Sequence, residues 1–154
     1  MNVNLTRAAT ALIASLALWA PAHAQVTVQD PWVRATVPQQ KATGLFASVT
    51  SAKGGRVVAA SSPAAEVVEI HEMAMDNQVM RMRAIPALEL PAGKAVELKP
   101  GGFHVMLMGL KQQVKEGDTV PVILVVEGAD GKRENVEVKA PARTLNPGAG
   151  GHRH

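Results

Sequence analysis

The chain has 154 residues and no cysteine, so disulfides, thiolate metal sites and thiol catalysis are all excluded. Its formal net charge is only +3 and aromatic residues make up 3% of it, which argues against nucleic-acid binding through a basic surface or through base stacking. The length suits a single domain with an ordinary hydrophobic core.

Residues 1–24 have the pattern of a secretory signal peptide. Arg7 precedes the apolar run 8–19, and small residues at Ala22 and Ala24 supply a cleavage pattern. A helix needs about 20 apolar residues to span a bilayer, and this run is shorter. We therefore expect an exported, periplasmic protein whose mature chain is not inserted in the membrane, with an uncleaved anchor as the alternative.

Residues 25–140 are expected to form one β-sandwich domain. Glycine and proline interrupt this part of the chain at short intervals, for example at Gly54-Gly55 and Pro100-Gly101-Gly102. Between them lie short segments rich in β-branched residues, such as 119–127 and 135–139. Regular turn signals between short strands predict an all-β fold, an antiparallel sandwich or barrel.

The segment 64–75 is ambiguous, because its alanine, glutamate and methionine content also suits a helix. Val67, Val68 and Ile70 favour a strand, and 75–78 resembles a turn that leads into 79–83. We predict a β-hairpin here.

Residues 141–154 are expected to form a flexible tail. They are rich in glycine and proline and offer almost nothing to bury, so an ordered structure would gain little.

Two three-residue patterns bring histidine and methionine together: His71-Glu72-Met73 and His104-Val105-Met106. In a strand, residues two apart point to the same face, so each pattern places an imidazole beside a thioether. Met80-Arg81-Met82 repeats the spacing without histidine, and six of the seven methionines fall between residues 73 and 108.

Imidazole and thioether together indicate a particular metal. The thioether sulfur is neutral, soft and polarisable, so it favours Cu(I) and offers little to zinc, magnesium or calcium. Uncharged ligands also favour the lower oxidation state of copper, and in an oxidising compartment a thioether cannot be lost to disulfide formation. Methionines also fill gaps in cores, however, so at this point both a copper site and ordinary packing remain open.

The spacing of four of these residues resembles the defining motif of the periplasmic CuA chaperone (PCuAC) family. Ten residues separate His71 from Met82, twenty-one separate Met82 from His104, and one separates His104 from Met106. The likeness extends from about residue 26 to residue 138. It includes Asp30-Pro31-Trp32-Val33-Arg34, the segment from Gln40 to Gly44 and the segment from Lys99 to Leu110.

The resemblance implies a cupredoxin-like sandwich that binds one Cu(I) per chain through His71, Met82, His104 and Met106. It also implies a non-enzymatic function, delivery of copper toward the CuA site of cytochrome c oxidase. The expected partners are cytochrome c oxidase subunit II, a Sco-type copper protein, or both, and a monomer is expected.

The tail departs from the family pattern. Many members of the family have a longer extension rich in histidine and methionine that is associated with Cu(II). Here only His152 and His154 remain, without methionine. They are candidates for an auxiliary Cu(II) site.

Other functions use the same residues. Copper buffering or resistance needs the same reversible Cu(I) binding as delivery does. A metal-dependent enzyme is a weaker alternative, because a blue-copper site needs cysteine and Glu72 is the only acid beside a candidate ligand. A metal-free structural sandwich is the third alternative.

Met73, Met75 and Met108 are candidates for an adaptable docking surface.

Overall fold

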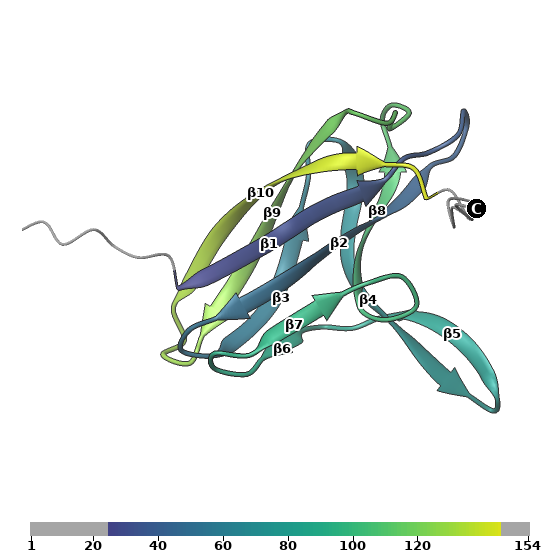
Figure 1. Ribbon diagram of the computed structural model, residues 1–154. Coiled ribbons are helices and arrows are strands. Elements are labelled where there is room, and N and C mark those ends of the chain that lie inside the picture. The colour runs from purple at the N-terminus through teal and green to yellow at the C-terminus, as the bar shows by residue number, and fades with distance from the viewer. Residues whose placement is uncertain (1–24, 146–154) are drawn as a thin grey trace, which may run out of the picture.

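The computed structural model describes residues 25–145, and ten strands in this range form one open sheet that folds into two layers (Figure 1). The first layer has the order β5-β4-β8-β2-β1, with β7 also paired to β2. Its strands are β1 (Val26–Arg34), β2 (Ala42–Ser51), β4 (Ala65–Asp76), β5 (Val79–Ala84), β7 (Ala95–Leu98) and β8 (His104–Leu110).

The second layer continues the order as β10-β9-β3-β6. Its strands are β3 (Gly55–Ser61), β6 (Leu88–Leu90), β9 (Thr119–Gly128) and β10 (Arg133–Arg143). The described residues contain no helix, so the expected all-β sandwich is confirmed. No helix among residues 25–145 is long and apolar enough to span a bilayer.

One strand pair departs from the antiparallel pattern. Strands β1 and β10 run parallel and join the two layers, with Val33 opposite Ala142. Every other strand pair of the described range is antiparallel. Parallel pairing is possible here because the two strands are far apart in the sequence and need no tight turn between them.

The same pairing moves the expected end of the domain. Strand β10 continues three residues past residue 140, with Pro141 opposite Thr119, because Ala142 is buried and its N–H donates to the carbonyl of Asp118. Strand β10 thus ends at Arg143, three residues beyond the predicted domain boundary at residue 140. The predicted signal peptide, His152 and His154 lie outside the described residues.

The core lies between the two layers, and β8 shows how the sequence builds it. Val105 and Leu107 are buried in the core, whereas their neighbours Met106 and Met108 are only partly buried. This alternation is the two-residue period of a strand whose one face packs against the opposite layer. The even-numbered side chains of β8 therefore point away from the core.

The ambiguous segment is a hairpin, as predicted. Strands β4 and β5 pair antiparallel, and Asn77 and Gln78 connect them with φ of 47° and 65°. Two successive residues with positive φ form the two-residue turn whose twist matches that of a hairpin. Figure 1 shows this hairpin extending beyond the two layers.

Candidate metal centre

All six methionines of the described residues lie on one face of the first layer. Residues directly opposite each other in an antiparallel pair point to the same side of the sheet. The register places Met73 opposite Met82, Met75 opposite Met80, and His71 opposite His104. Met106 and Met108 follow His104 on β8, two and four positions further along, and complete a face of thioethers and imidazoles opposite the core.

His71 and His104 form the centre of this face. Their ring centroids lie 5.7 Å apart with the ring planes at 61°, and the residues are only 9% and 5% exposed. Phe46 lies on the other side of His104, at a centroid distance of 6.3 Å. Two imidazoles are thus held side by side with little contact with solvent.

Each histidine uses one ring nitrogen in a hydrogen bond. His71 Nε2 lies 2.9 Å from Glu69 Oε2, and His104 Nδ1 lies 3.1 Å from the carbonyl oxygen of Gly102. Carboxylate and carbonyl oxygens accept hydrogen bonds, so each of these two nitrogens carries a proton.

The other ring nitrogens, His71 Nδ1 and His104 Nε2, are buried and have no hydrogen-bond partner. A buried polar atom without a partner is costly, and the exceptions tend to have a chemical role. A neutral imidazole whose N–H is held by a carboxylate or a carbonyl is the usual arrangement of a metal-binding histidine. The two free lone pairs therefore fit a metal ion.

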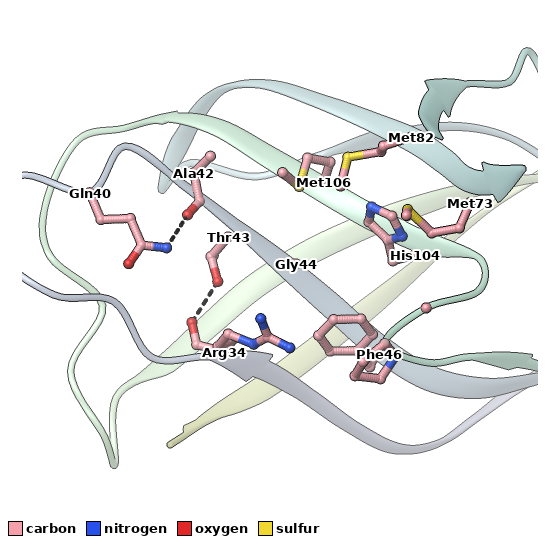
Figure 2. A pocket seen from close by; sticks show the side chains of 12 residues that line it. Arg34, Gln40, Ala42, Thr43, Gly44, Phe46, Met73, Met82, His104 and Met106 are labelled. Carbon is pink, nitrogen blue, oxygen red and sulfur yellow. Dashed lines mark hydrogen bonds between the residues drawn. The ribbon is translucent and has the colours of Figure 1, made fainter. Parts of the chain in front are cut away.

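Three of the four candidate ligands line a single pocket of about 200 Å³: Met82, His104 and Met106. Figure 2 shows their side chains gathered at one end of the pocket. His71 lies beside His104 and outside the pocket lining. Met82 is 48% exposed, so the thioether side of the pocket opens to solvent.

Met73 also lines this pocket, although the four-residue motif does not include it. It completes the first His-x-Met pattern and lies directly opposite Met82. The sequence signal was present, but the pairing of β4 with β5 was needed to place the two thioethers together.

Gly44 has no side chain, and this leaves room for the Phe46 ring, which forms one wall of the pocket. Gly44 lies opposite Met106, and a Cβ atom there would approach Cζ of Phe46 to 2.9 Å. The Phe46 ring therefore occupies the space that a side chain at residue 44 would fill. Phe46 itself packs against Trp32 at a centroid distance of 4.7 Å, with the ring planes tilted by 37°, and this contact supports the ring beside His104.

The pocket offers little to hard metal ions. Among residues 25–145, no group of three or more histidine, cysteine, aspartate or glutamate side chains is placed to hold a metal. The pocket beside His104 is lined instead by the thioethers of Met73, Met82 and Met106. This chemistry favours copper in its lower oxidation state over zinc.

The pKa of His104 is lowered, mainly because burial penalises the imidazolium. The charges of His71 and Arg34 lower it further, while the hydrogen bond to Gly102 opposes the shift. His104 therefore stays neutral, with its lone pair available, at lower pH than an ordinary histidine.

This shift predicts a pH dependence of the stability of the copper-free protein. The unfolded chain, with a histidine pKa of about 6.5, binds a proton before the folded chain does. The free energy of unfolding should therefore decrease as the pH falls below about 6.5, until the pH reaches the lowered pKa of folded His104. Urea unfolding between about pH 7.5 and about pH 5.5 measures this slope.

His104→Gln is the control for this pH dependence, because it removes the titrating group. The free energy of unfolding of the variant should depend less steeply on pH than that of the parent. Equal slopes in the variant and the parent would contradict the assignment.

Fold and site together define an all-β domain of the cupredoxin-like type with an imidazole and thioether face. The chain belongs to the LpqE-like family, since residues 26–142 match the family model described as "Putative lipoprotein LpqE-like".

Two relatives match the chain over most of its length. "Putative lipoprotein Lxx21020" of Leifsonia xyli is 34% identical over 125 residues, which cover 71% of this chain and 74% of the relative. "Uncharacterized protein RP573" of Rickettsia prowazekii is 30% identical over 124 residues, covering 77% of this chain and 68% of the relative.

The solved structures most like this chain include PCuAC domains. The apo PCuAC domain from PmoF1 and the copper-bound PCuAC domain from PmoF2 are 21% and 20% identical, with TM-scores of 0.63 and 0.62. Each match covers 79% of this chain, with 96% and 95% of the respective domains, and establishes the cupredoxin-like fold. CuI-DR1885 from Deinococcus radiodurans is 29% identical, with a TM-score of 0.60, over 80% of this chain and 82% of that one.

Proposed function

We propose that this protein is a periplasmic Cu(I) chaperone that holds one copper ion between His71, Met82, His104 and Met106. The proposal depends above all on two buried imidazole nitrogens without a hydrogen-bond partner, one on His104, which lines the thioether pocket, and one on His71 beside it. The copper-bound PCuAC domain from PmoF2 and CuI-DR1885, which share the fold, support copper as the metal.

In this proposal the chain presents His71 through Nδ1 and His104 through Nε2, because the other nitrogen of each ring is engaged. Met82 and Met106 supply sulfur. All four ligands are uncharged, so nothing in the set compensates the additional charge of Cu(II). The copper ion is the cargo of the protein and is held in its reduced form.

Release requires an acceptor with stronger soft ligands. Paired cysteine thiolates bind Cu(I) more strongly than thioethers do, so the ion would pass to them by ligand exchange. The exposure of Met82 gives such an acceptor access to one side of the ion. The acceptor we propose is the CuA site of cytochrome c oxidase subunit II, reached directly or through a Sco-type copper protein.

The periplasmic location agrees with the predicted signal peptide and with relatives described as lipoproteins. The 154 residues contain no cysteine, so attachment of a lipid to cysteine is not part of the proposal.

Titration with Cu(I) against a competing chelator tests copper binding, and X-ray absorption of the loaded protein tests the ligands. We expect one tightly bound Cu(I) per chain with two sulfur and two nitrogen neighbours. Absence of sulfur around the bound metal would refute the site.

Gene deletion distinguishes delivery from buffering. Loss of oxidase activity at low copper supports delivery. Sensitivity to high copper with normal oxidase activity supports the buffering alternative.

Glu69 is expected to position His71 for copper. Glu69→Leu removes the acceptor of the Nε2 proton, and loss of such an outer partner typically weakens metal affinity by about 10–100-fold. Glu69→Gln keeps an acceptor oxygen and should retain most of the affinity. Chelator competition measures both variants, and wild-type affinity in Glu69→Leu would contradict this role.

A further inference from the structure

The β4–β5 hairpin has two chemically different faces. On one face Met73 pairs with Met82 and Met75 pairs with Met80. The opposite face contains ion pairs, in which Arg83 lies 2.6 Å from Glu72 and Arg81 lies 3.4 Å from Asp76. Each arginine of the hairpin thus has a carboxylate partner. Between Ala84 and the turn of the hairpin, the thioether face contains no charged side chain.

The outer pair, Met75 and Met80, has no role in the core. The two residues are 67% and 47% exposed and are absent from the hydrophobic cluster between the layers. They lie next to the turn at Asn77 and Gln78, on the part of the hairpin that extends beyond the sandwich (Figure 1). Core packing therefore does not explain why both positions are methionine.

The register gives these two thioethers a common target. Directly opposite residues of an antiparallel pair have Cβ atoms about 4.5–5.5 Å apart, and two flexible methionine side chains at that distance reach a single ion. The next pair along the same face, Met73 and Met82, is within about 7–8 Å diagonally. That inner pair lines the pocket of His104 and Met106.

We propose that Met75 and Met80 form a second, weaker site for a soft monovalent cation, through which Cu(I) enters and leaves the histidine pocket. The inference rests on the proposed function, since the inner site is the destination of the ion. A site of two thioethers without imidazole binds more weakly than the inner site. Copper would therefore move inward on loading, passing from Met75 and Met80 to Met73 and Met82.

Silver(I) tests the proposal, because it is a soft monovalent ion that does not undergo the redox reactions of copper. The purified protein, labelled with ¹³C at the methionine methyl groups, is titrated with silver nitrate and followed by NMR. The first equivalent should shift the methyl signals of Met82 and Met106. A second, weaker step should shift those of Met75 and Met80.

The two steps separate failure of this inference from failure of the proposed function. If the first equivalent leaves Met82 and Met106 unchanged, the inner site itself is refuted. If the first step occurs but Met75 and Met80 never shift, or the second ion moves only other signals, the outer site is refuted.

A double variant supplies the complementary test. In the silver titration, the double variant Met75→Leu/Met80→Leu should lose the second step and keep the first. It should also take up Cu(I) from a chelate into the inner site more slowly than the parent does, with the same final affinity. Val79→Leu is the matched control, because Val79 is an exposed apolar residue of the same hairpin without sulfur. Loading by the double variant at the wild-type rate would overturn the role in entry.

Discussion

Replacing Met82 or Met106 by leucine should lower the affinity for Cu(I) by at least about 100-fold, the upper end of the effect of losing an outer-shell partner. Each substitution removes one of the two sulfur atoms of the proposed ligand set. The fold should change little, because exchange of methionine for leucine conserves volume and usually costs less than about 1.5 kcal/mol. Met82 is half exposed, which reduces the cost further.

Chelator competition for Cu(I) and urea unfolding of the copper-free protein measure the two quantities separately. Met108→Leu is the matched control, since Met108 lies on the same strand and the same face as Met106 but outside the pocket lining. Its copper affinity should equal that of the parent. Equal affinities in all three leucine variants would exclude Met82 and Met106 as ligands.

The second large effect concerns the other face of the same strand. Leu107 follows Met106 directly, is fully buried, and belongs to the core between the layers. Leu107→Ala should lower the free energy of unfolding by about 2–5 kcal/mol, because it removes buried apolar surface and leaves a cavity. Urea unfolding measures this loss.

The affinity for Cu(I) should show that the two faces of β8 act independently. At temperatures where Leu107→Ala remains folded, its affinity for Cu(I) should stay close to that of the parent, because Leu107 points away from the pocket. A large loss of affinity in the folded variant would mean that the core and the metal face are coupled. Retained stability would contradict the burial of Leu107.

The fold could be predicted to a large extent from the sequence. Turn residues at short intervals and β-branched segments between them indicated a β-sandwich, and Val67, Val68 and Ile70 outweighed the helical propensity of their neighbours. The two-residue period of strands also placed His104 beside Met106 on one face. These features are local, so they can be recognised from short stretches of sequence.

Long-range pairing could not be predicted in the same way. Nothing in the sequence states that His71 lies opposite His104, or that β1 pairs in parallel with β10. The role of Glu69 follows only from the hydrogen bond that it forms with His71. The continuation of β10 through Pro141 was missed because the composition of the tail suggested disorder, whereas pairing with β9 and β1 orders its first residues.

The turn at Asn77 and Gln78 determines which chemistry the hairpin presents to the pocket. Side chains alternate between the faces of a strand, so one additional residue in that turn would shift the register of β5 by a single position. Arg81 or Arg83 would then occupy the side where Met82 now points, and a guanidinium would replace sulfur beside the two imidazoles. The length of this turn thus decides whether a thioether or a guanidinium lies beside the two imidazoles.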